Sequence, residues 1–121
     1  LYESGKGIDK DYVEALAWYR KSAAKGDASA MRAIGRLYRL GLGVSMDLAE
    51  AWAWHSVAAR HFSAQEQQEA AMNQRELEFV DAILTAGQRK HAGTRAGEIE
   101  VLTRPAQAEP AKPPVRGETR T

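Results

Sequence analysis

Arg32, Arg36 and Arg39 are the residues of this chain whose types and spacing best suit recognition of another molecule. Their spacing of four and three places them within about 60° of arc on one side of a helix with 3.6 residues per turn. Guanidinium groups bind carboxylates through paired hydrogen bonds, so this stripe suits an acidic peptide or a free C-terminus. We predict that the three arginines bind a partner. The alternative is a solvated helix face whose charge is partly neutralised by nearby acids.

Other reactive residue types do not assemble into a site. His55 and His61 are six residues apart, on poorly matched helix faces, whereas zinc needs three or four converging ligands. Two Gly-x-Gly pairs lack the preceding strand and the third glycine of a dinucleotide-binding loop. The carboxylates within 66–81 lie on a strongly polar predicted helix, which favours a solvated face over a catalytic pair. The sequence therefore predicts no enzyme, no metal site and no cofactor.

Composition and charge narrow the class of protein further. The 121 residues are 44% hydrophobic and 27% charged, which suits one small globular or repeat domain. Net charge is +1, so no strong overall field favours nucleic acid, although residues 87–121 are mildly basic. The absence of cysteine excludes a disulfide framework, a zinc ribbon and a thiol nucleophile. No apolar run approaches the roughly 20 residues of a membrane span.

The chain repeats itself with a step of 36 residues. The step relates ten identical pairs, which are Leu1/Leu37, Tyr2/Tyr38, Gly5/Gly41, Gly7/Gly43, Asp11/Asp47, Glu14/Glu50, Ala15/Ala51, Ala17/Ala53, Trp18/Trp54 and Ala23/Ala59. A fixed period of this size is typical of a helical solenoid. Solenoids present extended surfaces to other molecules, so the period favours binding over catalysis.

Helical spacing of apolar residues predicts helices over 11–25, 28–40 and 47–60. Gly5 and Gly7 are expected to form a turn before the first of these helices. The second helix is expected to end at the matching pair, Gly41 and Gly43.

Local capping patterns define where these helices start. Asp11, Asp27 and Asp47 stand at the predicted N-caps. Ser63 and Glu66 form a capping-box pattern, which predicts a long final helix over 64–88.

The repeat pattern stops at this last predicted helix. No third Gly-x-Gly follows at the next step, so the segment 63–90 is expected to be a C-terminal capping helix. All four prolines lie beyond it and large apolar residues are few, which predicts a flexible tail over 91–121.

Four aromatic residues fall on the predicted helices. Trp18, Tyr19, Trp52 and Trp54 have the residue types of an aromatic ligand box, but Trp18 and Trp54 are related by the repeat. Packing at the seam between helices is the simpler interpretation, and we predict that these side chains belong to the core.

The motifs resemble the Sel-1-like repeat, a relative of the tetratricopeptide repeat. The chain reads Ile34-Gly-Arg-Leu-Tyr38, then Gly41-Leu-Gly-Val44, Asp47 and Ala51-Trp-Ala-Trp54. An earlier copy reads Gly5-Lys-Gly-Ile8, Asp11 and Ala15-Leu-Ala-Trp-Tyr-Arg-Lys-Ser-Ala-Ala24. The positions that carry the signature are Gly5, Gly7, Trp18, Gly35, Tyr38, Gly41, Gly43 and Trp54. The chain departs from the pattern at His55, where Tyr is usual, and at Val57, where Lys is usual.

The resemblance implies an all-α, right-handed α-α superhelical solenoid of antiparallel helix pairs. Its units would be the end of a first repeat (1–26), a second repeat (27–62), the capping helix (63–90) and the disordered tail (91–121). In tetratricopeptide-like solenoids the first helix of each pair lines the concave groove, which would place the arginine stripe there.

The resemblance also implies a protein-interaction scaffold or adaptor, often in bacterial signalling, envelope or secretion settings. The expected partner is a protein or peptide, with an acidic one favoured and nucleic acid not expected. The alternative is a non-catalytic spacer or regulatory segment of a larger bacterial envelope or signalling protein, with any enzymatic domain upstream. The chain starts within a repeat and without Met, which predicts a fragment of a longer protein and leaves the compartment open.

Overall fold

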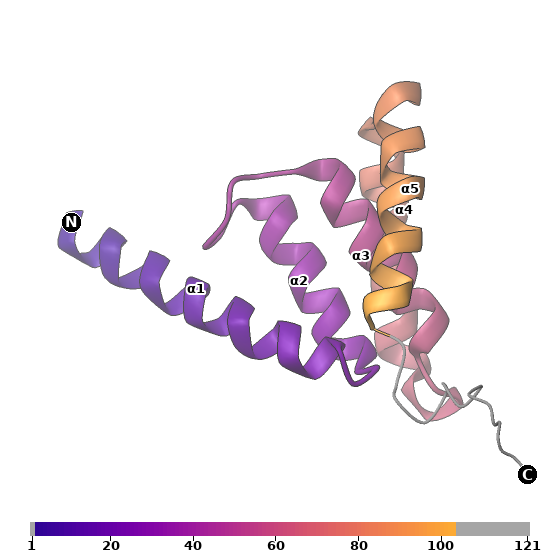
Figure 1. Ribbon diagram of the computed structural model, residues 1–121, viewed down its shortest axis with the longest axis horizontal. Helices are drawn as coiled ribbons and strands as arrows, with labels where there is room; N and C mark the ends of the chain where they lie inside the picture. The colour runs from indigo at the N-terminus through magenta and orange to yellow at the C-terminus, as the bar shows by residue number, and fades with distance from the viewer. Residues whose placement is uncertain (1, 104–121) are drawn as a thin grey trace, which may run out of the picture.

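The computed structural model describes the backbone of residues 2–103 and the side chains from Lys10 onward. Its elements are α1 (Tyr2–Ala23), α2 (Ala28–Leu40), α3 (Leu48–His61), the short 3-10 helix η1 (Ala64–Glu66), α4 (Gln67–Ile83) and α5 (Ala86–Leu102). Residues 2–103 contain no strand, so the predicted all-α class is confirmed for them. α1, α2, α3 and α4 each lie beside the next helix along the chain, as expected for a helical repeat, whereas α5 packs on α3 (Figure 1). No helix within 2–103 is both long and apolar enough to span a membrane.

The first helix is longer than predicted. α1 runs without a break from Tyr2 to Ala23, so the turn expected at Gly5 and Gly7 is wrong, and Asp11 lies inside the helix instead of capping it. Glycine permits a turn but does not impose one. A turn also needs an element to fold back on, and within 2–103 no element precedes α1.

α2 has the bounds that the sequence predicts, because its ends are locally encoded. The Asp27 carboxylate accepts hydrogen bonds from the backbone N–H groups of Ser29 and Ala30, at 3.0 and 3.4 Å. At the other end Gly41 adopts a left-handed conformation with φ of 69°. Gly43 also has positive φ, and a Cβ atom there would lie 2.8 Å from the backbone carbon of Tyr12. The second glycine pair therefore makes a turn that closes against α1.

The core lies between α1, α2 and α3. Met31, Ile34 and Val57 are fully buried, and they join a cluster with contributions from α1 and α5. Arg20 of α1 donates a hydrogen bond of 2.7 Å to the hydroxyl of Tyr38 on α2. Burial of apolar area at about 25 cal/mol per Å² is the main force that holds these helices together.

The predicted single helix over 64–88 is divided in two, which corrects the capping helix expected over 63–90. Leu84 is buried in an extended conformation between α4 and α5. Thr85 then starts α5, with reciprocal hydrogen bonds of 2.9 and 3.1 Å between its N–H and hydroxyl groups and Gln88. This capping box and the burial of Leu84 explain the break.

α5 corrects the flexible tail predicted over 91–121, which is wrong for residues 91–102. Ala92, Ala96 and Ile99 are buried at spacings of four and three, which is a helical stripe, and they pack on α3. Arg95 contacts Glu50 near the start of α3 and Glu100 contacts His61 at its end, so the two helices run parallel. The remainder of the predicted tail, 104–121, lies outside the described residues.

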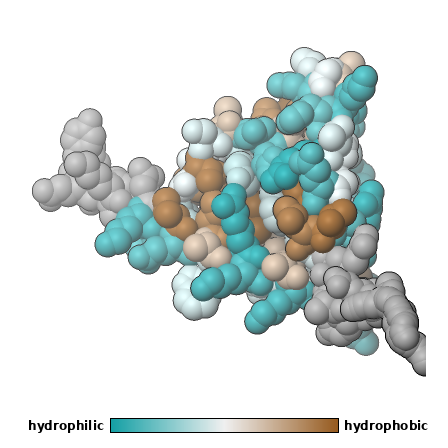
Figure 2. Space-filling view, in the orientation of Figure 1, coloured by the Kyte–Doolittle hydropathy of each residue, from teal (hydrophilic) through white to brown (hydrophobic). Residues whose placement is uncertain are grey.

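The surface of α5 is apolar where the helix ends. Val101 and Leu102 are exposed there. In the space-filling view a hydrophobic patch covers this lower part of α5, among mostly hydrophilic neighbours (Figure 2).

α4 occupies the place of a first helix of a third repeat, yet it does not carry the apolar face of one. The fully buried Met31 and Ile34 of α2 are related by the repeat step to Gln67 and Ala70 of α4. Gln67 is exposed. This face of α4 therefore offers little apolar area to a further helix.

Candidate functional site

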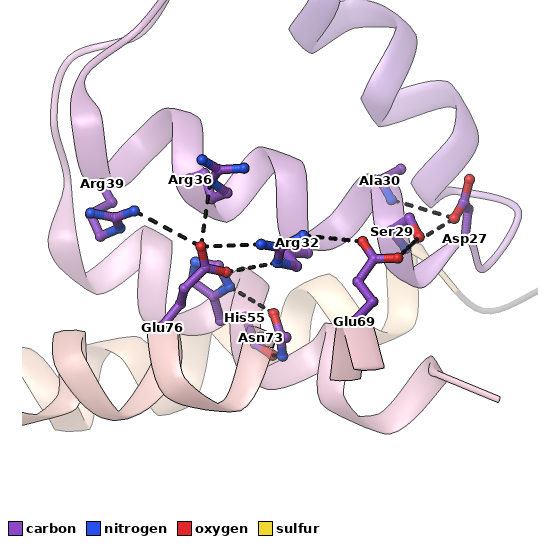
Figure 3. A network of polar contacts seen from close by, with 10 residues as sticks. All are labelled: Asp27, Ser29, Ala30, Arg32, Arg36, Arg39, His55, Glu69, Asn73 and Glu76. Carbon is purple, nitrogen blue, oxygen red and sulfur yellow. Dashed lines mark hydrogen bonds and ion pairs between the residues drawn. The ribbon is translucent and has the colours of Figure 1, made fainter. Parts of the chain in front are cut away.

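The arginine stripe of α2 lies along α4, which supplies two carboxylates to it (Figure 3). Glu76 accepts hydrogen bonds from the Nε and Nη2 atoms of Arg32 at 2.7 and 3.4 Å. Glu69 accepts from Arg32 Nη1 at 3.3 Å and from the hydroxyl of Ser29 at 2.7 Å. The Arg32 side chain is 13% exposed, so it holds α4 to α2 instead of facing an open groove.

The other two arginines share the Glu76 carboxylate but differ in exposure. Arg39 lies 4.0 Å from it, with its guanidinium 5.9 Å from the centre of the Phe79 ring. Arg36 lies 3.4 Å from the same oxygen, and its side chain is 49% exposed. The sequence therefore predicted one stripe, whereas the structure gives its members separate roles: Arg32 and Arg39 face α4, and Arg36 reaches the surface.

Desolvation and ion pairing act against each other at Arg32. Burial alone lowers the pKa of its guanidinium, but the hydrogen bonds and charges of Glu76 and Glu69 raise that pKa above its ordinary value. Glu69 and Glu76 are spaced by seven, as are Arg32 and Arg39. This matched spacing in the sequence indicates that the two glutamates can pair with the arginines, although the sequence interpretation treated such carboxylates as solvated.

Beneath this cluster His55 of α3 joins three helices. Its Nδ1–H donates to the side-chain oxygen of Asn73 at 2.8 Å, and the Asn73 amide donates back to the His55 backbone carbonyl at 3.0 Å. The other ring nitrogen, Nε2, is buried without a hydrogen-bond partner among the described residues. A Cβ atom on Gly35 of α2 would lie 2.8 Å from this ring. Glycine therefore allows α2 to approach the imidazole directly.

Acid should destabilise the fold through His55. Burial lowers the pKa of His55 below 6.5, with Arg39 and Arg32 acting in the same direction, while the Asn73 hydrogen bond and Glu76 oppose the shift. The unfolded chain then binds the proton at a higher pH than the native chain, so stability falls as pH drops below about 6.5. We expect a loss of up to about 1.4 kcal/mol per pH unit from this group, measured by urea unfolding between pH 7 and 5.

The matched variants separate His55 from the carboxylates. His55→Gln should remove this part of the pH dependence, whereas His91→Gln, at an exposed position, should retain it because His55 is unchanged. An identical pH dependence in wild type and His55→Gln would contradict the assignment.

The two repeat-related tryptophans have different surroundings, which corrects the prediction that both lie in the core. Trp54 is 5% exposed in the main core cluster, whereas Trp18 is 69% exposed with Lys21 4.8 Å from its ring centre. α5 packs on α3 and contributes residues to the core cluster that contains Trp54. No described helix packs on α1 in the corresponding way. Tyr19 is also partly exposed, so Trp18 and Tyr19 belong to the surface of α1.

The polar end of Trp54 is held by an ion pair that the sequence analysis missed. Its indole N–H donates to Glu50 at 3.2 Å, and Arg95 of α5 binds the same carboxylate at 2.9 and 3.0 Å. The hydrogen bond to Glu50 is the main reason that the pKa of Arg95 is raised. No local signal relates Arg95 to Glu50, because the contact depends on where α5 packs.

A groove runs between α1 and α2 beside the exposed arginine. It is formed by two adjoining hollows that share Tyr19, Ala33 and Arg36. We call it the α1–α2 groove and define it by Trp18, Tyr19, Ala33, Arg36, Leu37 and Leu40. The larger hollow measures about 500 Å³, which lies in the range of binding pockets. Aromatic walls beside a half-exposed cation suit a partner that offers apolar and acidic groups together.

Among the side chains of residues 10–103, this arrangement brings together neither a metal centre nor a reactive cluster. His55 and His61 lie in separate contacts, with Asn73 and with Glu100 respectively. No group of three or more His, Cys, Asp or Glu side chains able to hold a metal ion occurs among those residues.

Comparison with known protein families gives a match to the Sel1 repeat over residues 1–27 and 28–61. The first match ends in the turn between α1 and α2, and the second covers α2 and α3. Comparisons with curated proteins and with solved structures return no match. Because the two matched segments together cover half of the chain, the chain belongs to the Sel1 repeat family.

Proposed function

We propose that this chain is a non-catalytic scaffold that binds an acidic segment of a partner protein in the α1–α2 groove. Sel1 repeats generally mediate protein–protein interaction, which gives the class of function. The observation that supports this site is Arg36, whose side chain is 49% exposed and lies beside Trp18 and Tyr19. A carboxylate there would make a charge-assisted hydrogen bond while its apolar neighbours cover the aromatic rings.

The predicted binding residues Arg32, Arg36 and Arg39 contribute unequally to this proposal. Arg36 contacts the partner, whereas Arg32 and Arg39 hold α4 against α2 through Glu76. A charge reversal of all three would therefore disrupt the α2–α4 contact and would not report on binding alone.

The test is a single substitution that removes one charge. A partner protein is first captured with the chain and purified. Arg36→Gln should then weaken the affinity of the chain for this partner by about tenfold, the usual effect of losing one charge-assisted contact. Arg75→Gln on the exposed side of α4 is the matched control and should leave the affinity unchanged. Equal affinities for wild type and Arg36→Gln, measured by titration calorimetry, would contradict the proposal.

A further inference from the structure

We infer that α5 exchanges between two copies of this chain, so that the α5 helix of each copy packs on α3 of the other. The surface of α3 beneath α5 then joins the two copies in a closed dimer with twofold symmetry. Three features of the described residues carry this inference. They are the surface on which α5 packs, the joint that connects α5 to α4, and the glycines on the outer side of α5.

The surface of α3 beneath α5 recognises that helix by its shape and its charge. The buried side chains of α5 are small or apolar, and they are Ala92, Ala96 and Ile99. Among them Arg95 donates hydrogen bonds of 2.9 and 3.0 Å to the two oxygens of Glu50. Near the other end of α3, His61 lies 3.0 Å from Glu100. These ion contacts join α5 to α3 alone, so an α5 helix from a second copy can make them equally well.

α5 packs on α3 and makes few contacts with α4, which precedes it in the chain. Moving α5 from its own copy to a second one therefore loses little packing that the second copy does not restore. Reciprocal exchange covers the same surface of α3 in both copies. The second copy is thus the occupant whose complementarity to this surface is already present in the structure.

The joint between α4 and α5 has no backbone feature that forces it to bend. α4 runs antiparallel to α3 and α5 runs parallel to it, so the chain reverses its direction here. Leu84 and Thr85 are both extended, with φ of −82° and −76°, a conformation that any residue adopts. Neither is a glycine or a proline. The reversal is therefore held by side-chain contacts, which can open.

Arg89 clasps this joint from the surface. Its Nε atom donates to the Asp81 carboxylate at 3.1 Å, and its Nη2 atom donates to the carbonyls of Asp81 and Leu84 at 2.8 and 3.2 Å. The Arg89 and Asp81 side chains are about half exposed, so water can replace these contacts at modest cost. Opening the joint breaks the clasp within one chain, and an exchanged dimer does not restore it.

Two glycines weaken α5 without improving its packing. Gly93 and Gly97 lie inside the helix, and a Cβ atom on either would meet nothing outside its own turn of helix within 4 Å among the described residues. Each glycine lowers the equilibrium constant of helix formation about threefold relative to alanine. α5 therefore depends on α3 for its structure, which favours local opening followed by packing on either copy.

Hydrogen exchange of the full chain tests whether α5 is released. The amides of α5 should exchange through a local opening, faster than those of α3. Gly93→Ala combined with Gly97→Ala should slow the exchange of α5 about tenfold and leave α2 unchanged, because alanine stabilises the packed helix. Equal exchange of α5 and α3 in the wild type would show that α5 leaves only on global unfolding, which would overturn the inference.

A pair of charge variants tests the exchange itself. Glu50→Arg and Arg95→Glu each place like charges between α3 and α5, so each variant alone should be mainly monomeric. In an exchanged dimer of one variant with the other, opposite charges meet on both surfaces. Light scattering should give the equimolar mixture a dimer dissociation constant at least tenfold lower than that of either variant. Glu78→Arg and Arg75→Glu, on the exposed side of α4, are the matched pair and should gain nothing on mixing.

The clasp gives a test in which a damaging change promotes assembly. Arg89→Gln weakens the closed joint and leaves the contacts of α5 with α3 in place, so it should raise the dimer association constant about tenfold. Lys90→Gln, at the neighbouring exposed position, is the control and should leave that constant unchanged. If Arg89 only stabilised the fold, its loss would lower stability without promoting dimers, and the inference would fail.

Wild-type chains provide the result that does not depend on the folding of a charge variant. Chains of light and heavy isotope composition are mixed at high concentration, and native mass spectrometry should detect dimers that contain one chain of each. The absence of mixed dimers would overturn the inference. Dimers that form equally well in each charge variant alone and in their mixture would also overturn it, because the contact would then lie on another surface.

Discussion

Trp54→Ala should destabilise the fold by about 3–5 kcal/mol, the usual cost of truncating a buried tryptophan. The side chain is 5% exposed and lies in the cluster that joins α2, α3 and α5. The truncation would also remove the indole N–H that Glu50 accepts, so the Glu50–Arg95 contact would lose part of its support. The free energy of unfolding is measured by urea titration at neutral pH.

The repeat supplies the matched control for this variant. Trp18→Ala removes the same side chain at the equivalent position of α1, where it is 69% exposed. It should cost no more than about 1 kcal/mol, since only surface contacts such as that with Lys21 are lost. Comparable losses for the two variants would show that the environments of the two tryptophans do not differ in solution.

Glu76→Ala should be the second most damaging single change, with an expected loss of about 2–4 kcal/mol. The Glu76 carboxylate is 18% exposed and is the shared ion-pair partner of Arg32, Arg36 and Arg39. Its removal would leave the largely buried Arg32 with Glu69 alone and Arg39 without an ion pair among the described residues. Unpaired charge in a partly buried site is costly, so α4 should separate from α2 at lower denaturant concentration.

Two further variants show whether charge or hydrogen bonding matters. Glu76→Gln retains an oxygen that accepts from Arg32 and should lose about half as much stability. Glu78→Ala removes a carboxylate from the exposed side of the same helix, where it accepts only from Gln74 among the described residues, and should be nearly neutral. If Glu76→Ala and Glu78→Ala unfolded at the same urea concentration, the Glu76 cluster would not stabilise the fold.

Sequence reasoning succeeds where the determinants are local. The bounds of α2 follow from the Asp27 cap and from the left-handed Gly41, which act within a few residues. It failed for α5, although the Thr85–Gln88 capping box and the stripe of Ala92, Ala96 and Ile99 are present in the sequence. Two alanines give a weak apolar signal, and only packing on α3 makes that stripe a core face.

The candidate site shows the same division between local and tertiary information. The spacing of Arg32, Arg36 and Arg39 correctly places them on one helix face. Which of them reaches solvent depends on the position of Glu76, and that depends on how α4 lies along α2. The repeat step likewise equates Trp18 with Trp54 in sequence but cannot state which helices surround each one.

The polar side of α4 also limits how this family member can change by duplication of its own coding sequence. A unit of 36 residues inserted before Ser63 would meet the apolar faces of α2 and α3, and it would be buried like the copy it repeats. The same unit placed after α4 would meet the exposed Gln67 at the position that corresponds to the buried Met31, where an incoming apolar side chain gains little burial. Lengthening by tandem duplication is therefore directional: new units are tolerated on one side of α4, and those on the other side would need substitutions in α4 first.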